Sequence, residues 1–227
     1  MHQNKTLVNE EAYRQIKEEL LAKNTTLVAV SKTKPVEDIQ ALYNFGQRDF
    51  GENYVQELVQ KQTELPNIRW HFIGHLQSNK VKYIASFVHF IQSVDNEKLL
   101  REINKQAAKN NRTIDCLLQV HIAEEETKFG LNEEELKLLI TEIKLGKNNF
   151  TNICIKGLMG MASNTIDEQK IRSEFQHLKI LFDTYSLLST NNCQLSVLSM
   201  GMSSDYKIAI EEGSNTIRIG SLLFGKR

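Results

Sequence analysis

The chain has 227 residues, with 28 lysines and arginines, 28 aspartates and glutamates, 41% hydrophobic residues and only 2 prolines. This composition is typical of a folded globular protein and excludes the disordered, collagen-like and fibrous classes. The formal net charge is zero at pH 7. A broad positive surface for nucleic acid or anionic membranes is therefore absent, and we expect neither as a partner.

The sequence indicates a protein that stays in a reducing compartment. It has no run of about 18 apolar residues that could span a bilayer, and its start at residues 1–5 is polar rather than the apolar core of a signal peptide. The three cysteines Cys116, Cys154 and Cys193 are widely spaced, without a Cys-x-x-Cys pair. This spacing argues against a disulfide framework and a cysteine zinc site. We therefore expect a cytoplasmic location.

Short apolar, β-branched runs alternate with amphipathic segments of helical period along the chain. The amphipathic segments predict helices that include residues 9–23, 96–109, 132–145 and 168–187, the first of which precedes every strand. The apolar runs predict eight strands, at residues 27–32, 49–52, 69–74, 89–94, 115–122, 153–161, 195–202 and 216–220.

This alternation indicates right-handed βαβ units and a parallel sheet. Eight such units close naturally into a barrel, whereas an open doubly wound sheet more often has five or six strands and a glycine-rich first turn. Neither G-x-G-x-x-G nor a P-loop occurs here. We therefore predict one α/β domain over residues 1–227, a TIM-type (β/α)8 barrel with an additional N-terminal helix. Its reactive groups belong at the carboxyl ends of the strands.

The first strand ends on a lysine. Strand alternation places Val28, Val30 and Lys32 on one face. If this face is the barrel interior, desolvation and the neighbouring cation Lys34 both lower the pKa of Lys32 toward that of a nucleophilic amine. Such an amine forms a Schiff base with an aldehyde. The pattern alone favours the plainer alternative, a solvated lysine that leaves a strand end.

The second and third runs carry weaker signals. Asn53 is a candidate helix cap with Gln56 three residues later, and a capping box alone accounts for this segment. His71 and His75 have an H-x-x-x-H spacing that suggests zinc, but Gly74 and the missing glutamate after the first histidine disfavour the helical zinc arrangement. We expect no metal.

The seventh run leads into Ser203, a candidate N-cap for a short helix at residues 206–212. In the eighth run, alternation turns the isoleucines toward the helices and Arg218 into the barrel, where a guanidinium needs an acceptor or a carboxylate partner. Gly220 and Ser221 then supply an N–H group and a hydroxyl. Barrels commonly bind phosphate after strands seven and eight, so these signals indicate a phosphate site. The alternatives are a structural salt bridge for Arg218 and ordinary helix caps for the rest.

Six sequence blocks, taken in order, resemble the pyridoxal 5'-phosphate homeostasis protein family, cytoplasmic barrel proteins similar to the barrel domain of alanine racemase. The blocks are AVSKTKP at 29–35, FGENYVQE at 50–57, WHFIGHLQSNK at 70–80, GLM at 157–159, LSMGMSSD at 198–205 and RIG at 218–220 with FG at 224–225. The segment 125–130, with Lys128, follows the fifth strand as a related loop does in the family. Phe129 and the stretch 160–162 depart from the family pattern.

The resemblance implies pyridoxal 5'-phosphate as the cofactor and assigns a role to each candidate residue. Lys32 carries the cofactor as a Schiff base, Arg218 faces the pyridine nitrogen and Asn53 is a nearby polar contact. The phosphate is held by the Met202 N–H group, Ser203, Gly220 and Ser221.

The resemblance also implies a carrier that holds the cofactor and delivers it to acceptor apoenzymes. A cationic Arg218 disfavours protonation of the ring nitrogen, which weakens the cofactor as an electron sink. Racemisation needs a second acid/base, which in alanine racemase-like enzymes comes from the partner subunit's additional domain, and this sequence stops at Arg227. We expect a monomer without catalytic residues. The alternatives are an amino-acid racemase that uses Lys32 and an unidentified second base, and a regulator that acts through protein interactions alone.

Overall fold

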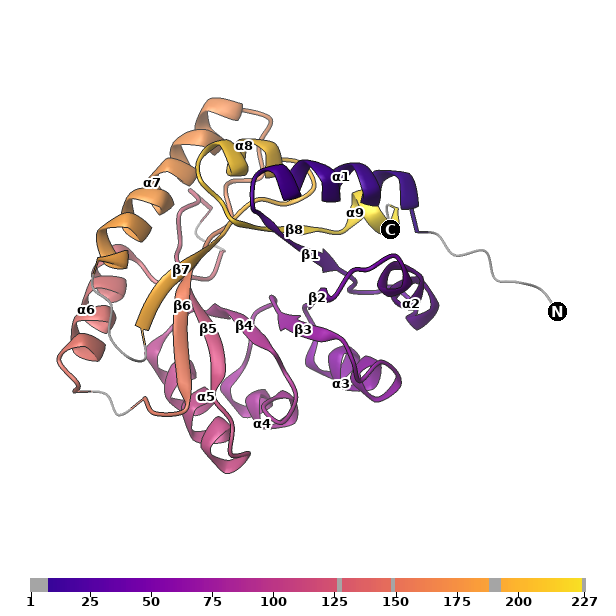
Figure 1. Cartoon of the computed structure of the whole chain (residues 1–227). Helices are drawn as coiled ribbons and strands as arrows, with labels where there is room; N and C mark the ends of the chain where they lie inside the picture. The colour runs from indigo at the N-terminus through magenta and orange to yellow at the C-terminus, as the bar shows by residue number, and fades with distance from the viewer. Residues whose placement is uncertain (1–7, 126–127, 148–149, 188–192, 226–227) are drawn as a thin grey trace.

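The computed structural model describes residues 8–125, 128–147, 150–187 and 193–225. Residues 1–5, whose polar character argues against a signal peptide, lie outside these ranges. Arg227, the last residue of the sequence, also lies outside them. Eight parallel strands close into one barrel in the order β1 to β8, because β1 pairs with both β2 and β8 (Figure 1). The predicted barrel is confirmed. The strands are β1 Thr26–Val30, β2 Asp49–Glu52, β3 Arg69–Phe72, β4 Phe90–Val94, β5 Ile114–Gln119, β6 Ile153–Met159, β7 Cys193–Ser199 and β8 Thr216–Ile219.

Helices follow the strands and form the outer layer of the barrel (Figure 1). The four predicted helices are confirmed to within one residue at each end, as α1 Glu10–Ala22, α5 Glu97–Lys109, α6 Glu133–Lys144 and α7 Glu168–Ser186. The other helical elements are α2 Val36–Asn44, α3 Val55–Glu64, the 3-10 turn η1 Ser78–Lys80, α4 Val81–Ile84, α8 Tyr206–Glu211 and α9 Ser221–Phe224. None of the helices in the described ranges is long and apolar enough to cross a membrane.

Several strands end earlier than the sequence predicts, by up to three residues. The predicted runs continue past the strand ends because apolar residues such as Ile73, Met161 and Met202 line the mouth of the barrel. Lys32 therefore lies in a turn beyond β1 rather than in the strand itself. The hydrogen bonds between β1 and β2 continue to Ser31, the residue before Lys32, since the Ser31 N–H group donates to the Gly51 carbonyl oxygen at 3.0 Å.

Alternation along the strands produces two buried layers. Leu27, Ala29, Ile217 and Ile219 belong to the main core between the strands and the helices, as predicted for the isoleucines. The barrel interior contains a separate apolar cluster of Phe90, Leu117 and Met159, together with polar side chains that are described below. The interior is thus packed rather than open, as expected for a barrel of eight strands.

The N-terminal helix α1 lies beside α9 and the last strand in Figure 1. The Asn9 N–H group donates to the Leu223 carbonyl oxygen at 2.8 Å, and the Tyr206 hydroxyl donates to Glu19 Oε2 at 3.1 Å. These contacts hold α1 against the βα units that follow strands β7 and β8, next to the mouth of the barrel.

Candidate functional site

A cavity of about 440 Å³ opens at the carboxyl ends of the strands. Its volume falls within the range of about 300–1,000 Å³ that is typical of small-molecule sites. All seven sequence-predicted site residues line this cavity, although they come from four separate βα units. They are Lys32, Asn53, Met202, Ser203, Arg218, Gly220 and Ser221.

The turn that carries Lys32 has a strained backbone. Thr33 adopts a left-handed conformation with φ of 64°, which is unusual for a β-branched residue. The turn is closed by a hydrogen bond from the Lys34 N–H group to the Ser31 carbonyl oxygen at 3.0 Å. The Thr33 N–H group donates to Glu57 Oε1 at 2.6 Å. Contacts with α3 therefore hold the lysine turn in a conformation that local preferences disfavour.

A buried ionic cluster supports this turn from below. Lys61 Nζ lies 2.7 Å from Glu52 Oε1, from Glu57 Oε1 and from the Ser31 carbonyl oxygen. The Ser31 hydroxyl also donates to Glu52 Oε1, at 2.6 Å. Burial raises the pKa of Glu52, and the Lys61 ammonium opposes this shift. Sequence reasoning missed this cluster because it placed Glu52 at the end of a strand and explained the residues that follow, Asn53 to Gln56, by a helix cap.

Lys34 has its own structural partners. Its ammonium donates to the Phe224 carbonyl oxygen at 2.7 Å and to the Gly225 carbonyl oxygen at 3.3 Å. Lys34 also lines the cavity, so a second positive charge lies near Lys32, as the sequence predicts. The bonds to the end of α9 tie the loop after β1 to the last helix.

Ser203 joins the two loops expected to bind phosphate. Its Oγ accepts a hydrogen bond from the Gly220 N–H group at 3.2 Å. The prediction that Ser203 caps the next helix is wrong, because α8 begins at Tyr206 with Asp205 as its N-cap residue. The Ser203 hydroxyl thus links the segment after β7 to the segment after β8 and does not cap α8.

The Met202 N–H group has an acceptor within the protein. It donates to Asp205 Oδ1 at 2.5 Å, and burial raises the pKa of Asp205. Gly201, which precedes it, has φ of +95°, and a Cβ there would lie 2.6 Å from the Ala209 Cβ. Only glycine fits this position without a shift in the backbone or in α8.

Arg218 points into the barrel, as the strand alternation predicts, and is only 4% exposed. Its guanidinium donates to Ser199 Oγ at 2.6 Å and to the Gly160 carbonyl oxygen at 3.0 Å. The ion pairs between described residues do not include Arg218, so the structural salt-bridge alternative is wrong. Burial lowers the pKa of Arg218 to about 10, which leaves it charged at neutral pH.

Asn53 faces the same cavity with an unused acceptor. The capping prediction is wrong, since α3 begins at Val55 after Tyr54 and has no side-chain cap. Asn53 Oδ1 is buried and has no hydrogen-bond partner in the described part of the chain. Gly74 permits this placement, because a Cβ there would lie 2.3 Å from the Asn53 carbonyl oxygen. A buried acceptor that faces a cavity is suited to a donor on a ligand.

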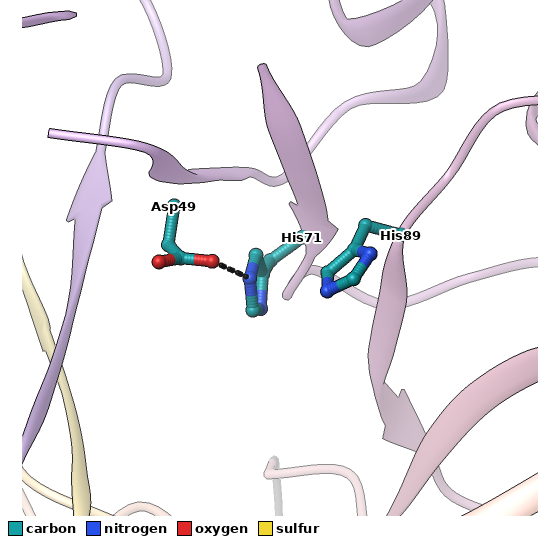
Figure 2. A group of neighbouring side chains, drawn as sticks. All are labelled: Asp49, His71 and His89. Carbon is teal, nitrogen blue, oxygen red and sulfur yellow. Dashed lines mark hydrogen bonds and ion pairs between the residues drawn. The ribbon is translucent and has the colours of Figure 1, made fainter. Parts of the chain in front are cut away.

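The structure does not bring His71 and His75 to one site. His75 Nδ1 lies 3.0 Å from Asp95 Oδ2, whereas His71 joins Asp49 and His89 at the amino ends of the strands (Figure 2). Both Asp49 oxygens accept hydrogen bonds from Arg69, at 2.8 and 2.5 Å. A cation in this group would have to displace a guanidinium, so we assign the group to an ion-paired cluster.

The described residues of the loop after β5 are not among those that line the cavity. Lys128 Nζ donates to the Ala162 carbonyl oxygen at 2.5 Å and pairs with Glu125 at 3.0 Å. The Phe129 ring stacks on His75 with 3.8 Å between the ring centroids. Lys128 is not among the described residues that line the cavity, and residues 126–127 of the segment 125–130 lie outside the described ranges.

A closed parallel barrel with a lysine turn after its first strand and hydroxyl groups after its last two strands belongs to the class of alanine racemase N-terminal domains. The family model described as "Alanine racemase, N-terminal domain" matches residues 10–227. A pyridoxal phosphate homeostasis protein from Haemophilus influenzae is 37% identical over 229 residues, which cover 99% of this chain and 94% of that protein. The chain belongs to the pyridoxal phosphate homeostasis protein family.

Solved structures agree with this assignment. PipY of Synechococcus elongatus PCC7942 with PLP bound has a TM-score of 0.85 and 32% identity, with 95% of this chain and 99% of that chain covered. Alanine racemase from Streptomyces lavendulae shares the fold, with a TM-score of 0.75 and 13% identity. This chain covers 58% of that larger protein.

Proposed function

We propose that this chain binds pyridoxal 5'-phosphate reversibly at Lys32 and holds it for delivery to acceptor apoenzymes. The observation that carries the proposal is that Lys32, Arg218 and the hydroxyl and amide groups after β7 and β8 surround one cavity. The names of the relatives and the PLP-bound structure of PipY support the choice of ligand.

The residues present fit this cofactor. Ser203 and Ser221 offer hydroxyl donors for a phosphate at one side of the cavity, next to the Gly220 N–H group that bonds Ser203 Oγ. Arg218 uses two N–H groups within the protein and keeps further donors for the ring nitrogen, since a guanidinium has five N–H groups. The unpaired Asn53 Oδ1 is a third point of contact. When bound, pyridoxal 5'-phosphate supplies an aldehyde and an electron-withdrawing ring.

Lys32 is the residue we assign to covalent binding. Its amine would condense with the aldehyde of the bound cofactor to form a C=N bond, and the aldehyde oxygen would leave as water with the two amine hydrogens. Hydrolysis or exchange with another amine reverses this step, which makes the bond suitable for storage and transfer. Lys34 and Arg218 add positive charge around the cavity, and nearby cations lower the pKa of an amine.

The cavity chemistry favours a carrier over a racemase. Among the described residues that line the cavity, the only titratable side chains are Lys32, Lys34 and Arg218. A racemase needs a second acid/base on the face opposite the lysine, and a permanently charged arginine is a poor proton acceptor. Arg218 also disfavours protonation of the ring nitrogen, which limits stabilisation of a carbanion.

We place this function in the cytoplasm and in a single chain. The three cysteines are unpaired, which agrees with a reducing compartment. The seven residues that we assign to the cofactor site line one cavity of this chain. We also propose a monomer, as expected from the sequence.

Borohydride trapping tests the binding mode. Protein incubated with pyridoxal 5'-phosphate and reduced should gain the mass of one reduced cofactor, and peptide mapping should place it on Lys32. Lys32→Ala should lose the adduct, whereas Lys34→Ala should keep it on Lys32. A trapped adduct retained at full level in Lys32→Ala would refute the assignment.

Two further assays separate the candidate functions. Protein loaded with pyridoxal 5'-phosphate should activate a pyridoxal phosphate-dependent apoenzyme. Protein that carries the same amount of borohydride-reduced cofactor should activate it more slowly, because the reduced cofactor cannot be transferred. Exchange of the α-hydrogen of free amino acids with deuterated solvent should stay near the level of unbound cofactor. Rapid, saturable exchange would favour the racemase instead.

A further inference from the structure

A chain of hydrogen bonds between buried side chains crosses the barrel interior from the cavity to the opposite end. It runs from Arg218 to Ser199 at 2.6 Å, from Ser199 to Gln92 at 2.7 Å, from Gln92 to His71 at 2.9 Å and from His71 to Asp49 at 3.0 Å. Its five members come from β8, β7, β4, β3 and β2. All five are buried.

The direction of each bond in this chain follows from two requirements. An arginine side chain only donates, so Ser199 Oγ accepts from Arg218, and the Ser199 hydroxyl proton needs an acceptor, which Gln92 Oε1 provides at 2.7 Å. This orients the Gln92 amide so that Nε2 donates to His71 Nδ1. His71 then carries its proton on Nε2 and donates to Asp49 Oδ1. The reverse amide orientation would leave the Ser199 hydroxyl with no acceptor in the chain.

The far end of the chain is anchored by charge. Asp49 accepts a hydrogen bond from His71 (Figure 2). It accepts two more from Arg69. Burial acts to raise the pKa of Asp49, but the bonds from His71 and Arg69 outweigh it and hold the pKa well below its usual range. The chain therefore begins at a cation and ends at a carboxylate, with aligned dipoles between them, an arrangement in which hydrogen bonds strengthen one another.

We propose that Ser199 and Gln92 are positioning residues that hold the Arg218 guanidinium toward the bound cofactor. The inference rests on the proposed function, in which Arg218 faces the pyridine nitrogen. The hydrogen-bond partners of the guanidinium, Ser199 and the Gly160 carbonyl, are neutral, so they fix its orientation without forming an ion pair with it. Burial lowers the pKa of Arg218, but the nearby Asp205 carboxylate acts to raise it and so favours the charged form.

A double-mutant cycle on cofactor affinity tests the proposal. Ser199→Ala should weaken equilibrium binding of pyridoxal 5'-phosphate about tenfold, the effect expected from the loss of a hydrogen bond to a charged group. Gln92→Leu removes the neutral hydrogen bond that orients Ser199 and should weaken binding about fivefold. In an Arg218→Met background, Gln92→Leu should change the affinity by less than about twofold, because the residue through which it acts is gone. Gln106→Leu on α5, a buried glutamine bonded to Glu102, is the matched control and should leave affinity unchanged. Equal losses from Gln92→Leu in both backgrounds would overturn the proposal.

A measurement on the cofactor-free protein keeps the test valid if a variant fails to fold. Nitrogen NMR of isotope-labelled histidine should show His71 as the tautomer protonated on Nε2, and detection of the Nδ1-protonated form would overturn the chain even if the cofactor binds. Wild-type protein that takes up no cofactor would instead refute the proposed function, while the tautomer would still decide the direction of the chain. The two failures are thus distinguishable.

Discussion

Lys61 Nζ lies 2.7 Å from Glu52 Oε1, and both side chains are buried beneath the turn that carries Lys32. The ammonium also bonds the Ser31 carbonyl oxygen, one residue before Lys32. The charge pair therefore connects α3 to the end of β1 as well as to β2. Its structural role is to hold the lysine turn in place.

Removal of Lys61 should be strongly destabilising. In Lys61→Met, Glu52 remains buried without its partner, and the free energy of unfolding should fall by about 3–5 kcal/mol. The double variant Lys61→Met/Glu52→Gln should recover part of this loss, because the uncompensated charge is gone. Urea unfolding of the three proteins provides the measurement. A loss below about 1 kcal/mol in Lys61→Met would contradict a buried ionic role.

Asn53→Ala should separate binding from folding. Asn53 Oδ1 has no partner among the described residues, so its removal should change the free energy of unfolding by less than about 0.5 kcal/mol. If the oxygen contacts the cofactor, the affinity for pyridoxal 5'-phosphate should fall about fivefold to tenfold. Equilibrium titration monitored by cofactor absorbance checks this. Unchanged affinity would remove Asn53 from the site.

Asp49 should make stability sensitive to acid. Its pKa is lower in the folded state than the ordinary value of 3.8, so the folded protein binds fewer protons than the unfolded chain as the pH falls below that value. The contribution of Asp49 is therefore fully present above about pH 4 and is lost progressively at lower pH. Asp49→Asn should cost about 2 kcal/mol at pH 7 and flatten the decline below pH 4.

Urea unfolding at several pH values measures this dependence. Glu134→Gln, at an exposed position on α6, is the control and should retain the wild-type pH profile. A wild-type slope in Asp49→Asn would show that other carboxylates cause the acid sensitivity.

Gly201→Ala should damage the loop between β7 and α8. The substitution combines a left-handed backbone with a contact of 2.6 Å to the Ala209 Cβ, and the cost should be about 3 kcal/mol. Gly146→Ala is matched in backbone, with φ of +67°, but meets open space and should cost only about 1 kcal/mol. Thermal and urea unfolding give the comparison. An equal loss of unfolding free energy in Gly201→Ala and Gly146→Ala would mean that α8 shifts easily to make room for the new Cβ.

The barrel was predictable from the sequence because its strands and helices have different apolar periods. The same alternation placed Arg218 inside the barrel and Lys32 at its mouth. The ends of the strands were harder to predict from the sequence, because apolar side chains beyond them, such as Met161 and Met202, line the cavity. Asn53 was read as a cap because an asparagine before a helix has the same local pattern in either role.

The buried polar groups could not be paired from the sequence. Gln92 and Ser199 are 107 residues apart, and only closure of the barrel brings β4 and β7 side chains together across its interior. A signal was nevertheless present, because the alternation places each of these polar residues at an inward position of its strand. Lys61 gave no comparable signal, since a lysine on an amphipathic helix is usually solvated.

The bonds from Lys34 to the end of α9 have a consequence for the whole ring of βα units. Lys34 and Phe224 are 190 residues apart, yet they meet where the first and last units of the barrel adjoin. A closed ring built from an open chain has one such seam, at which no peptide linkage joins the neighbouring units. Here the seam is closed by the pairing of β1 with β8, and the Lys34 ammonium adds a second connection beside the cavity, between the first loop and the last helix.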